Sequence, residues 1–475
     1  MTAQTILPAN TLSSGYDVAN SVRLDGSSAY MGKTMGTPTD ADKYTFSFWC
    51  KRSKLGAQQS IFRSTDDGTN DSHVTFQSDD TLRFEEYGGS ASIGKLQTTQ
   101  VFRDVSSWYH IVLVYDSGNG TAGNRMRMYV NGSEVTAFGT DNNPSQNADS
   151  FFNKDGEALH FGRTSYGGGA NYFGGYVAEV VMCDGQAYAA SDFGEFDEDS
   201  PTIWKPKDVS GLTFGNNGFY LDFEDSSNLG NDANGGTDFS ETNLAATDQT
   251  TDTCTNNFAT INPLDNYWAG ATLEEGNTKV STGSSNEAMS TSTFAMTAGR
   301  WYMEADFISG AGARMCGVTP TVSFQTSSHG KAGDVTPHTA TYIGSGKVQE
   351  GNGSGGQTEL ADYNSYATGD IIGIYMDLDN FKAYFSKNGT LQSATGIDLD
   401  SLAANGTGHY MFFVGDNNSG ALVCEANFGN GFQSLSSAVA DDNGFGAFEY
   451  SPNITGDGTA KSFYSVCSKN LAEFG

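Results

Sequence analysis

Residues 108–135 constrain the fold more than any other part of the sequence. They open with the short apolar, β-branched run 111–115, which is typical of a strand buried on both faces. Charged and apolar residues then alternate over 125–130 and stop at Asn131-Gly132, the pair best suited to the positive φ angles of a two-residue hairpin turn. The stretch therefore predicts a buried strand followed by a hairpin with one solvated face.

The same pattern recurs at residues 370–389, which end in Asn388-Gly389. A chain of 475 residues is too long for a single core, so the repeat suggests two domains of one kind. Its 59 glycines and 9 prolines, beside 31 phenylalanines and 22 tyrosines, are typical of many short strands joined by tight turns. We predict an all-β protein built from two tandem antiparallel β-sandwiches with little helix.

The charge and the cysteines argue against several classes of function. A formal net charge of −31 argues against nucleic-acid binding, which needs cations to replace phosphate counterions. The six cysteines lie far apart without a metal-binding spacing, so we expect small buried thiols. We find no charged leader followed by an apolar segment, and no apolar run near about 18 residues. We therefore expect synthesis in the cytoplasm and no insertion into a membrane.

Composition shifts along the chain suggest its domain boundaries. Alternating strands begin at residue 21 and recur at the spacing of roughly 8 to 12 residues expected of a sandwich. We predict an N-terminal arm at 1–20, a first sandwich at 21–230 and a second at 256–435. Residues 231–255 contain few large apolar side chains and predict a linker. The aromatic segment 436–475 predicts an extended tail that packs along a domain or a neighbouring subunit.

Ordered motifs in both predicted sandwiches match known families. The first contains, in order, SVRLDGSSAYMGK, FSFWCKR, SSWYHIVLVYD, NRMRMYVNG, HFGR and FGGYVAEVVMCDGQA. These resemble the laminin-G-like, concanavalin A-like jelly roll of fibre and structural proteins of tailed bacterial viruses, especially marine ones. The second contains GDIIGIYMDLDNFKAYFSKNG, HYMFFVGDNN and ALVCEANFGNGF, and resembles a SPRY-like domain. The resemblance implies a virion protein such as a tail fibre or a surface fibre of the capsid.

Glucanases share the jelly-roll class, and their reaction needs a pair of carboxylates. A retaining glycosidase places two of them about 5 to 5.5 Å apart. Glu195 and Asp197 alternate, but they lie beside Gly194 and Ser200-Pro201, which predicts a solvated loop. The glucanase pattern Glu-x-Asp-x-x-Glu fails here because residue 200 is serine. Asp377 and Asp379 precede a turn, where acids commonly end a strand. We therefore expect no enzymatic activity.

Metal-binding side chains are sparse. His110 and His160 lie between strand residues, and we expect both to be satisfied there without binding a ligand. Calcium is the one cofactor left open, since related jelly rolls often carry it on loops. The weak candidate ligands are Asp66, Asp67, Asn70 and Asp71, and the alternative is a solvated acidic loop.

Two loops have the composition of a glycan site, which needs flat aromatic faces and convergent polar groups on a rigid scaffold. The loop 163–172 supplies Arg163, Tyr166, Asn171 and Tyr172. The long polar loop 346–366 supplies Asp362, Tyr363, Asn364 and Tyr366. Plain surface loops or subunit contacts are the alternative interpretation.

These observations together favour a non-enzymatic virion structural protein that contributes to host attachment by binding glycans or other cell-surface molecules. Two alternatives stay open: a polysaccharide depolymerase of glucanase-like fold, and a purely architectural capsid decoration protein. The partners that we expect are other virion proteins, host surface glycans and further copies of the chain, as in the trimers that such viral fibres often form.

Overall fold

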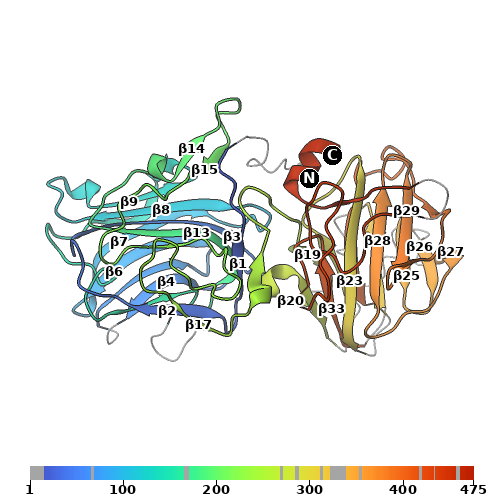
Figure 1. The fold of residues 1–475 in the computed structure, drawn as a ribbon, viewed down its shortest axis with the longest axis horizontal. Coiled ribbons are helices and arrows are strands. Elements are labelled where there is room, and N and C mark those ends of the chain that lie inside the picture. The colour runs from blue at the N-terminus through green and yellow to red at the C-terminus, as the bar shows by residue number, and fades with distance from the viewer. Residues whose placement is uncertain are drawn as a thin grey trace. The chain divides into compact units, whose positions relative to one another are not determined.

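The computed structural model describes residues 15–65, 69–164, 171–267, 271–283, 288–310, 314–320, 338–351, 356–416, 420–432, 434–455 and 460–475. These residues form two compact units, one ending at Asn256 and the other beginning at Asn257 (Figure 1). The predicted all-β class is confirmed: both units are antiparallel sandwiches. The described helical segments are short: α2 (Ser468–Phe474), η1 (Ala122–Asn124), η3 (Ala190–Asp192), η4 (Ala246–Asp248) and η5 (Glu275–Asn277).

The strands of the first unit form two large sheets and a small hairpin. In spatial order, the first sheet contains β10 (Ser133–Glu134), β9 (Met126–Val130), β8 (Tyr109–Asp116), β3 (Lys43–Arg52), β13 (Gly174–Asp184), β1 (Ser21–Asp25) and β18 (Gln249–Thr250), with β16 (Phe219–Leu221) also paired to β13. The second contains β11 (Phe138–Asn142), β7 (Ala91–Val101), β6 (Thr81–Gly88), β5 (Asp71–Phe76), β4 (Gln59–Thr65), β12 (Ala158–Phe161), β2 (Tyr30–Thr34) and β17 (Ser240–Thr242). The hairpin pairs β14 (Gly194–Phe196) with β15 (Trp204–Pro206).

Apolar side chains from the facing sides of the two sheets make the core of this unit. Phe46 on β3 stacks on Phe62 on β4 with ring centroids 4.9 Å apart, and both side chains are fully buried. Alternate residues of each strand join this core because successive side chains point to opposite faces of a sheet. The residues between them on each strand of the second sheet therefore point to its outer face.

The outer face of the first sheet is covered as well, which explains the apolar run 111–115. Val112 and Val114 pack outward with Trp204 of β15, while Ile111 and Leu113 face the core between the sheets. The predicted turn also forms, since Asn131 and Gly132 both have positive φ angles. A Cβ atom on Gly132 would lie 2.3 Å from the Trp204 ring, so glycine is needed for packing as well as for the turn.

The predicted linker at 231–255 is wrong. Its residues form β17, which pairs with β2, and β18, which pairs with β1. Phe239 is buried in the core, and Asp252 is fully buried beside Lys51. Few apolar residues suffice here because buried hydrogen bonds and an ion pair fix the segment to the sandwich.

The second unit repeats the architecture. In spatial order, one sheet contains β19 (Ile261–Tyr267), β22 (Ala288–Ser292), β32 (Met411–Asp416), β24 (Arg314–Thr319), β25 (Ala340–Ile343), β26 (Lys347–Gly351) and β27 (Gln357–Asp362). The other contains β20 (Ala271–Glu274), β21 (Lys279–Thr282), β33 (Leu422–Asn427), β23 (Arg300–Gly310), β28 (Ile371–Asp377), β29 (Lys382–Lys387) and β30 (Thr390–Leu391), with β31 (Ile397–Asp398) on β29 and β34 (Tyr464–Ser465) on β23.

The aromatic tail packs on the second unit itself. Phe448, Ile454 and Phe463 are buried in one cluster with tyrosines of β23, β28 and β29. The short strand β34 pairs parallel to β23 and carries the chain into α2. The tail therefore packs along a domain, which is the first of the two predicted alternatives, and its contact with a neighbouring subunit stays a prediction.

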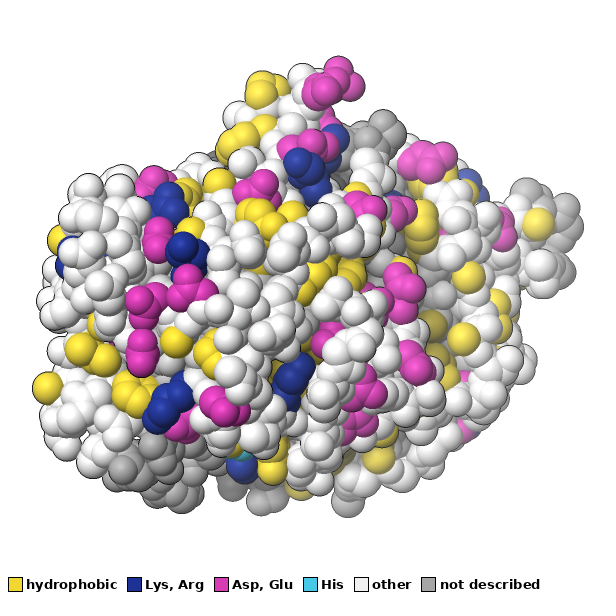
Figure 2. Space-filling view, turned by 60° about the vertical axis from the view of Figure 1, so that its left-hand side comes forward, with side chains coloured by type: hydrophobic (Ala, Val, Ile, Leu, Met, Phe, Trp, Pro, Cys, Tyr) yellow, Lys and Arg dark blue, Asp and Glu magenta, His cyan; other side chains and the backbone are white. Residues whose placement is uncertain are grey.

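The surface reflects the excess of acidic residues. Acidic side chains are spread over the face drawn in Figure 2, with basic side chains among them. In a chain with a net charge of −31, a cation without a described acidic partner is a distinctive feature.

Candidate functional site

A continuous row of side chains crosses the outer face of the second sheet. The strand registers place its members directly opposite one another, from β17 at one edge to β11 at the other: Ser240, Gly32, His160, Arg63, His73, Glu85, Lys95 and Asn142. Cross-strand partners lie on the same face of a sheet. Residues from eight separate strands thus make one polar track perpendicular to the strands.

Ion pairs hold the middle of this row. Arg63 Nη2 lies 2.7 Å from Asp71 Oδ2, and His73 Nδ1 lies 2.8 Å from Asp71 Oδ1. On the other side, His73 Nε2 lies 3.1 Å from Glu85 Oε2, and Lys95 Nζ lies 3.8 Å from the same oxygen. The network fixes these side chains in one arrangement and leaves them largely buried.

The network also shifts the protonation of its members. Burial alone would lower the pKa of His73, but its hydrogen bonds to Asp71 and Glu85 outweigh burial and raise it. Burial opposes ionisation of Glu85 too, yet the hydrogen bond and the charge of His73 bring its pKa down to about 2. Glu85 is therefore an ionised carboxylate at neutral pH, and its hydrogen bond favours a protonated His73.

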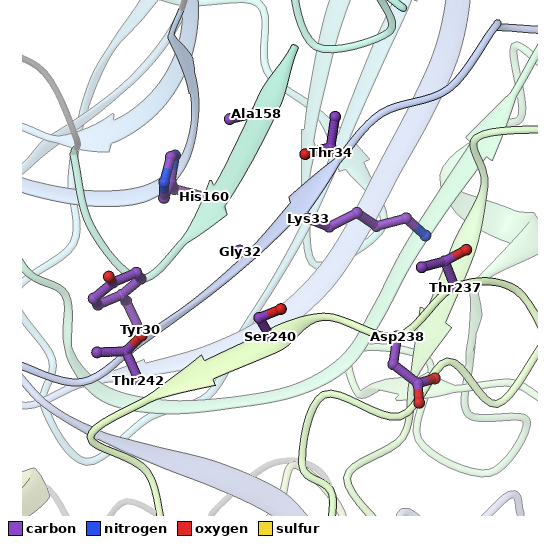
Figure 3. A pocket seen from close by; sticks show the side chains of 10 residues that line it. All are labelled: Tyr30, Gly32, Lys33, Thr34, Ala158, His160, Thr237, Asp238, Ser240 and Thr242. Atoms are coloured by element: carbon purple, nitrogen blue, oxygen red, sulfur yellow. The ribbon is translucent and has the colours of Figure 1, made fainter. Parts of the chain in front are cut away.

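A polar hollow of about 440 Å³ opens at the β17 edge of this row. Its floor is formed by β12, β2 and β17, and Gly32 lies at its centre (Figure 3). Figure 3 shows Tyr30 and His160 at one end and Lys33 with Asp238 at the other. Its lining residues are Tyr30, Gly32, Lys33, Thr34, Ala158, His160, Thr237, Asp238, Ser240 and Thr242.

Tyr30 organises the first end of the hollow. The guanidinium carbon of Arg163 lies 3.7 Å from the centre of the Tyr30 ring, a short cation–π contact. The rings of His160 and Tyr172 lie 6.1 and 6.4 Å from the same ring. The structure therefore brings two predicted residues, Arg163 and Tyr172, to a site whose other members the sequence analysis missed. The aromatic composition of YMGKT at 30–34 is the only signal that could have indicated Tyr30.

Several buried polar atoms at this end have no hydrogen-bond partner among the described residues: Arg163 Nε, His160 Nδ1, Arg63 Nε and Thr164 Oγ1. Such atoms are costly unless something satisfies them, and ligands do so at binding sites. Burial and the charge of Arg163 lower the pKa of His160 to about 4, so this ring is neutral at pH 7. The expectation of a satisfied side chain is thus wrong for His160. It is correct for His110, whose ring nitrogens lie 2.9 Å from Ser47 Oγ and Trp204 Nε1.

The opposite end of the hollow is balanced in charge. Lys33 Nζ lies 3.9 Å from Asp232 Oδ2. The same atom lies 5.3 Å from the centre of the Phe219 ring and 5.4 Å from that of Phe239. Burial lowers the pKa of Lys33, although Asp232 and Asp238 act against that effect. The two ends therefore differ, since Lys33 has a carboxylate beside it.

The other predicted binding residues do not join this site. Asn171 contributes a backbone carbonyl, which accepts a hydrogen bond from Ser60 N at 2.7 Å, and Tyr166 lies outside the described residues. In the second unit, most of the predicted loop 346–366 is the hairpin of β26 and β27. Tyr366 is a core residue and not a binding residue, because its hydroxyl donates to the Tyr342 carbonyl at 2.9 Å.

The remaining three residues lie along that hairpin and the segment that follows it. Asp362 is exposed on β27 opposite Lys347, while Tyr363 is half-buried against the Tyr342 ring. Asn364 donates from its side chain to Gln392 Oε1 at 2.9 Å. None of these three residues lines the hollow around Gly32.

Only two of the four calcium candidates, Asn70 and Asp71, lie within the described residues. Asp66 and Asp67 lie outside the described residues. Asn70 accepts a hydrogen bond from Gly89 N at 3.0 Å, and Asp71 is already paired with Arg63 and His73, which would compete with a cation. Among the described residues, no three acidic, histidine or cysteine side chains form a group suited to a metal ion.

The carboxylates weighed for catalysis have structural partners. Glu195 lies on β14, not in the predicted loop, and Lys205 Nζ lies 3.6 Å from it and 3.4 Å from Asp197. Asp377 accepts hydrogen bonds from Asn380, and Asp379 accepts one from Gly299 N. Each carboxylate therefore stabilises a turn or a hairpin.

Fold and site together define a concanavalin A-like β-sandwich with a polar track on one outer face. Residues 25–189, which contain β2 to β13, match the laminin G-type family model described as the concanavalin A-like lectin/glucanases superfamily. No curated protein matches the chain. In the part of the chain that the structure describes, no helix is long and apolar enough to cross a membrane.

Solved structures with a similar arrangement come from several organisms. The SPRY domain of human HERC1 is 16% identical, with 35% of this chain and 96% of that chain covered and a TM-score of 0.29. Domains LG4-5 of the mouse laminin alpha1 chain are 12% identical, with 87% and 85% covered and a TM-score of 0.29. Domain 4 of the arabinanase AbnA from Geobacillus stearothermophilus, solved with arabinotriose, is 16% identical, with 36% and 73% covered and a TM-score of 0.28.

Proposed function

We propose that the first unit binds glycans without cleaving them, as the host-attachment module of a virion structural protein. The observation that carries the proposal is the hollow around Gly32, which joins an aromatic platform at Tyr30 to the polar row across the sheet. Sugar rings stack their C–H faces on aromatic side chains, and their hydroxyls bond to fixed polar groups. The lining of the hollow offers such groups in Ser240, Thr242 and His160.

The chemistry of the row favours binding over hydrolysis. A general acid in a glycosidase needs a carboxyl group that stays protonated near neutral pH. Glu85 has a pKa of about 2, and both it and Asp71 are hydrogen-bonded to His73. The second candidate, a polysaccharide depolymerase, predicts new reducing ends when the protein is incubated with β-glucans or host capsule. Turnover abolished by Glu195→Gln or Asp197→Asn would favour that candidate.

The virion role rests on the ordered sequence motifs of residues 21–230. In this proposal the chain assembles with other virion proteins and with further copies of itself, as a tail fibre or a fibre on the capsid. Immunogold labelling of intact particles distinguishes tail from head, and sedimentation gives the oligomeric state. Labelling of the head together with no retention on any glycan would instead favour an architectural decoration protein.

The binding site is tested by filling the hollow. A Cβ atom at Gly32 would have its nearest contact at 3.6 Å, so Gly32→Val places a side chain on the floor of the hollow without a clash at Cβ. We expect this variant to fold and to lose retention on host envelope and on glycan arrays. The matched control is Gly139→Val at the far edge of the same sheet, where Cβ also has room. Equal binding by both variants would contradict the assignment of the site.

A further inference from the structure

Resting on the proposed glycan function, we infer that the Tyr30 end of the hollow selects an anionic sugar residue, whose carboxylate or sulfate group pairs with Arg163. The inference names a ligand class that the fold alone does not imply. It follows from the contrast between Arg163, which lies over the lining residue Tyr30, and two nearby cations, Arg63 and Lys33.

Arg163 differs from its neighbours because no described acidic residue pairs with it. Arg63 pairs with Asp71, and Lys33 lies beside Asp232. Among the described residues Arg163 has no ion pair, and its buried Nε atom has no hydrogen-bond acceptor. The chain has 56 acidic against 25 basic residues, so a partner for this cation would have been easy to supply. A partly buried guanidinium without one is suited to an acidic group from outside.

The contact with Tyr30 leaves the guanidinium free to bind. At 3.7 Å from the ring centre, the guanidinium lies against the aromatic face and is attracted by its electrons. A cation–π contact is not a hydrogen bond, so it uses none of the guanidinium N–H donors. A planar carboxylate, or two oxygens of a tetrahedral sulfate group, can accept two such N–H bonds at once, which makes Arg more selective than Lys for them.

His160 lines the Tyr30 end of the hollow as a neutral ring, so it adds no second positive charge there. Its ring lies 6.1 Å from Tyr30, and its Nδ1 atom has no partner among the described residues. A neutral imidazole can hydrogen-bond to a sugar hydroxyl beside the acidic group. With a pKa near 4, His160 does not titrate between pH 5.5 and 8. His160 itself should therefore add no pH dependence to binding over that range.

The test uses the full chain and three immobilised polymers: polygalacturonate with carboxylates, dextran sulfate with sulfate esters, and neutral dextran. We expect Arg163→Gln to weaken binding to the acidic polymer about 10- to 100-fold, as loss of a charge-assisted pair does. The control Arg103→Gln removes the same charge from a residue of the first unit whose side chain is 58% exposed. Arg163→Lys keeps the charge but loses the planar pair of bonds, so it should bind with intermediate affinity.

The outcomes separate the inference from the function on which it rests. Preference for polygalacturonate identifies a carboxylate ligand, and preference for dextran sulfate identifies a sulfate ester. Retention of neutral glycans alone by the wild type overturns the anionic ligand and leaves the glycan function standing. Equal losses in Arg163→Gln and Arg103→Gln also overturn it, since they would reflect general charge. No retention of any glycan refutes the proposed function and this inference together.

If Arg163→Gln does not fold, wild-type affinity in a folded Arg163→Lys variant overturns the paired-bond geometry.

Discussion

The Nζ atom of Lys51 lies 2.8 Å from the Oδ2 atom of Asp252, and both side chains are shielded from solvent. Trp108 Nε1 donates to the other carboxylate oxygen at 3.2 Å. Replacing Asp252 with Asn leaves the Lys51 charge buried without its counter-ion. We expect the first unit to lose about 3 to 5 kcal/mol of unfolding free energy, measured by urea denaturation.

A second ion pair of the same unit provides the control. Glu195 is 51% exposed and lies 3.6 Å from Lys205. Exposed pairs contribute little, so Glu195→Gln should change the unfolding free energy by less than about 1 kcal/mol. Similar losses in the two variants would show that Asp252 does not anchor its segment.

The second unit should become less stable as the pH rises. Burial raises the pKa of Glu304 to about 7, although backbone amides of Glu449 and Tyr450 donate to its carboxylate. Because the folded-state pKa exceeds the ordinary 4.5, this group contributes stability below pH 4.5 that is lost as the pH rises through 7. Between pH 5 and 8 the loss is on the order of 3 kcal/mol.

Comparison with Glu304→Gln isolates this contribution from the other carboxylates. The stability difference between the wild type and the variant should move in favour of the variant as the pH rises from 5 to 8. Glu359→Gln, at an exposed ion pair with Lys347, serves as the matched control. A pH-independent difference would contradict the assignment.

His73 should titrate above the ordinary histidine pKa of 6.5. Its raised folded-state pKa means that its stabilising contribution is full below pH 6.5 and is lost as the pH rises through the folded value. NMR titration should show this shift, whereas His110, with a pKa of about 3, should stay neutral over the same range. The stability advantage of the wild type over His73→Gln should shrink at alkaline pH. A His73 midpoint below 6.5 would show that Asp71 and Glu85 do not hold the proton.

Phe463 should be essential for the second unit. It is fully buried, 5.2 Å from the Tyr375 ring in centroid distance. We expect Phe463→Ala to lower the unfolding free energy by about 3 to 5 kcal/mol, measured by thermal or urea denaturation. Phe445→Ala, at a partly exposed tail residue, should cost much less. If sedimentation showed subunit dissociation with unchanged monomer stability, the tail would be a subunit contact after all.

Local patterning was enough to predict the class of the fold. The buried run 111–115 and the turn at Asn131-Gly132 depend on side-chain alternation and on allowed φ angles, both of which are properties of neighbouring residues. Composition also singled out Arg163 and Tyr172 as candidates, because an aromatic and cationic loop is a local signal, and both lie beside the Tyr30 ring. Tyr30 itself was not singled out, since only the pairing of β2 with β12 brings it near them.

The errors have the same physical origin. The segment 231–255 has the composition of a linker, but its Asp252 forms a buried ion pair with Lys51, 201 residues earlier in the chain. Tyr366 lies in a polar segment typical of an exposed loop, yet its buried hydroxyl donates a hydrogen bond to the Tyr342 carbonyl. Long-range polar contacts of this kind leave no periodic trace in a sequence.

The pairing of β34 with β23 also determines when the second unit can mature during synthesis. The early strand β23 has its parallel neighbour at Tyr464–Ser465, and the cluster around Phe463 stays open until that segment has left the ribosome. The first compact unit ends at Asn256, so its chain is complete before most of the second unit is translated, and domains generally fold as units during synthesis. A nascent chain arrested between these points would therefore carry one finished sandwich and one that still requires protection from aggregation.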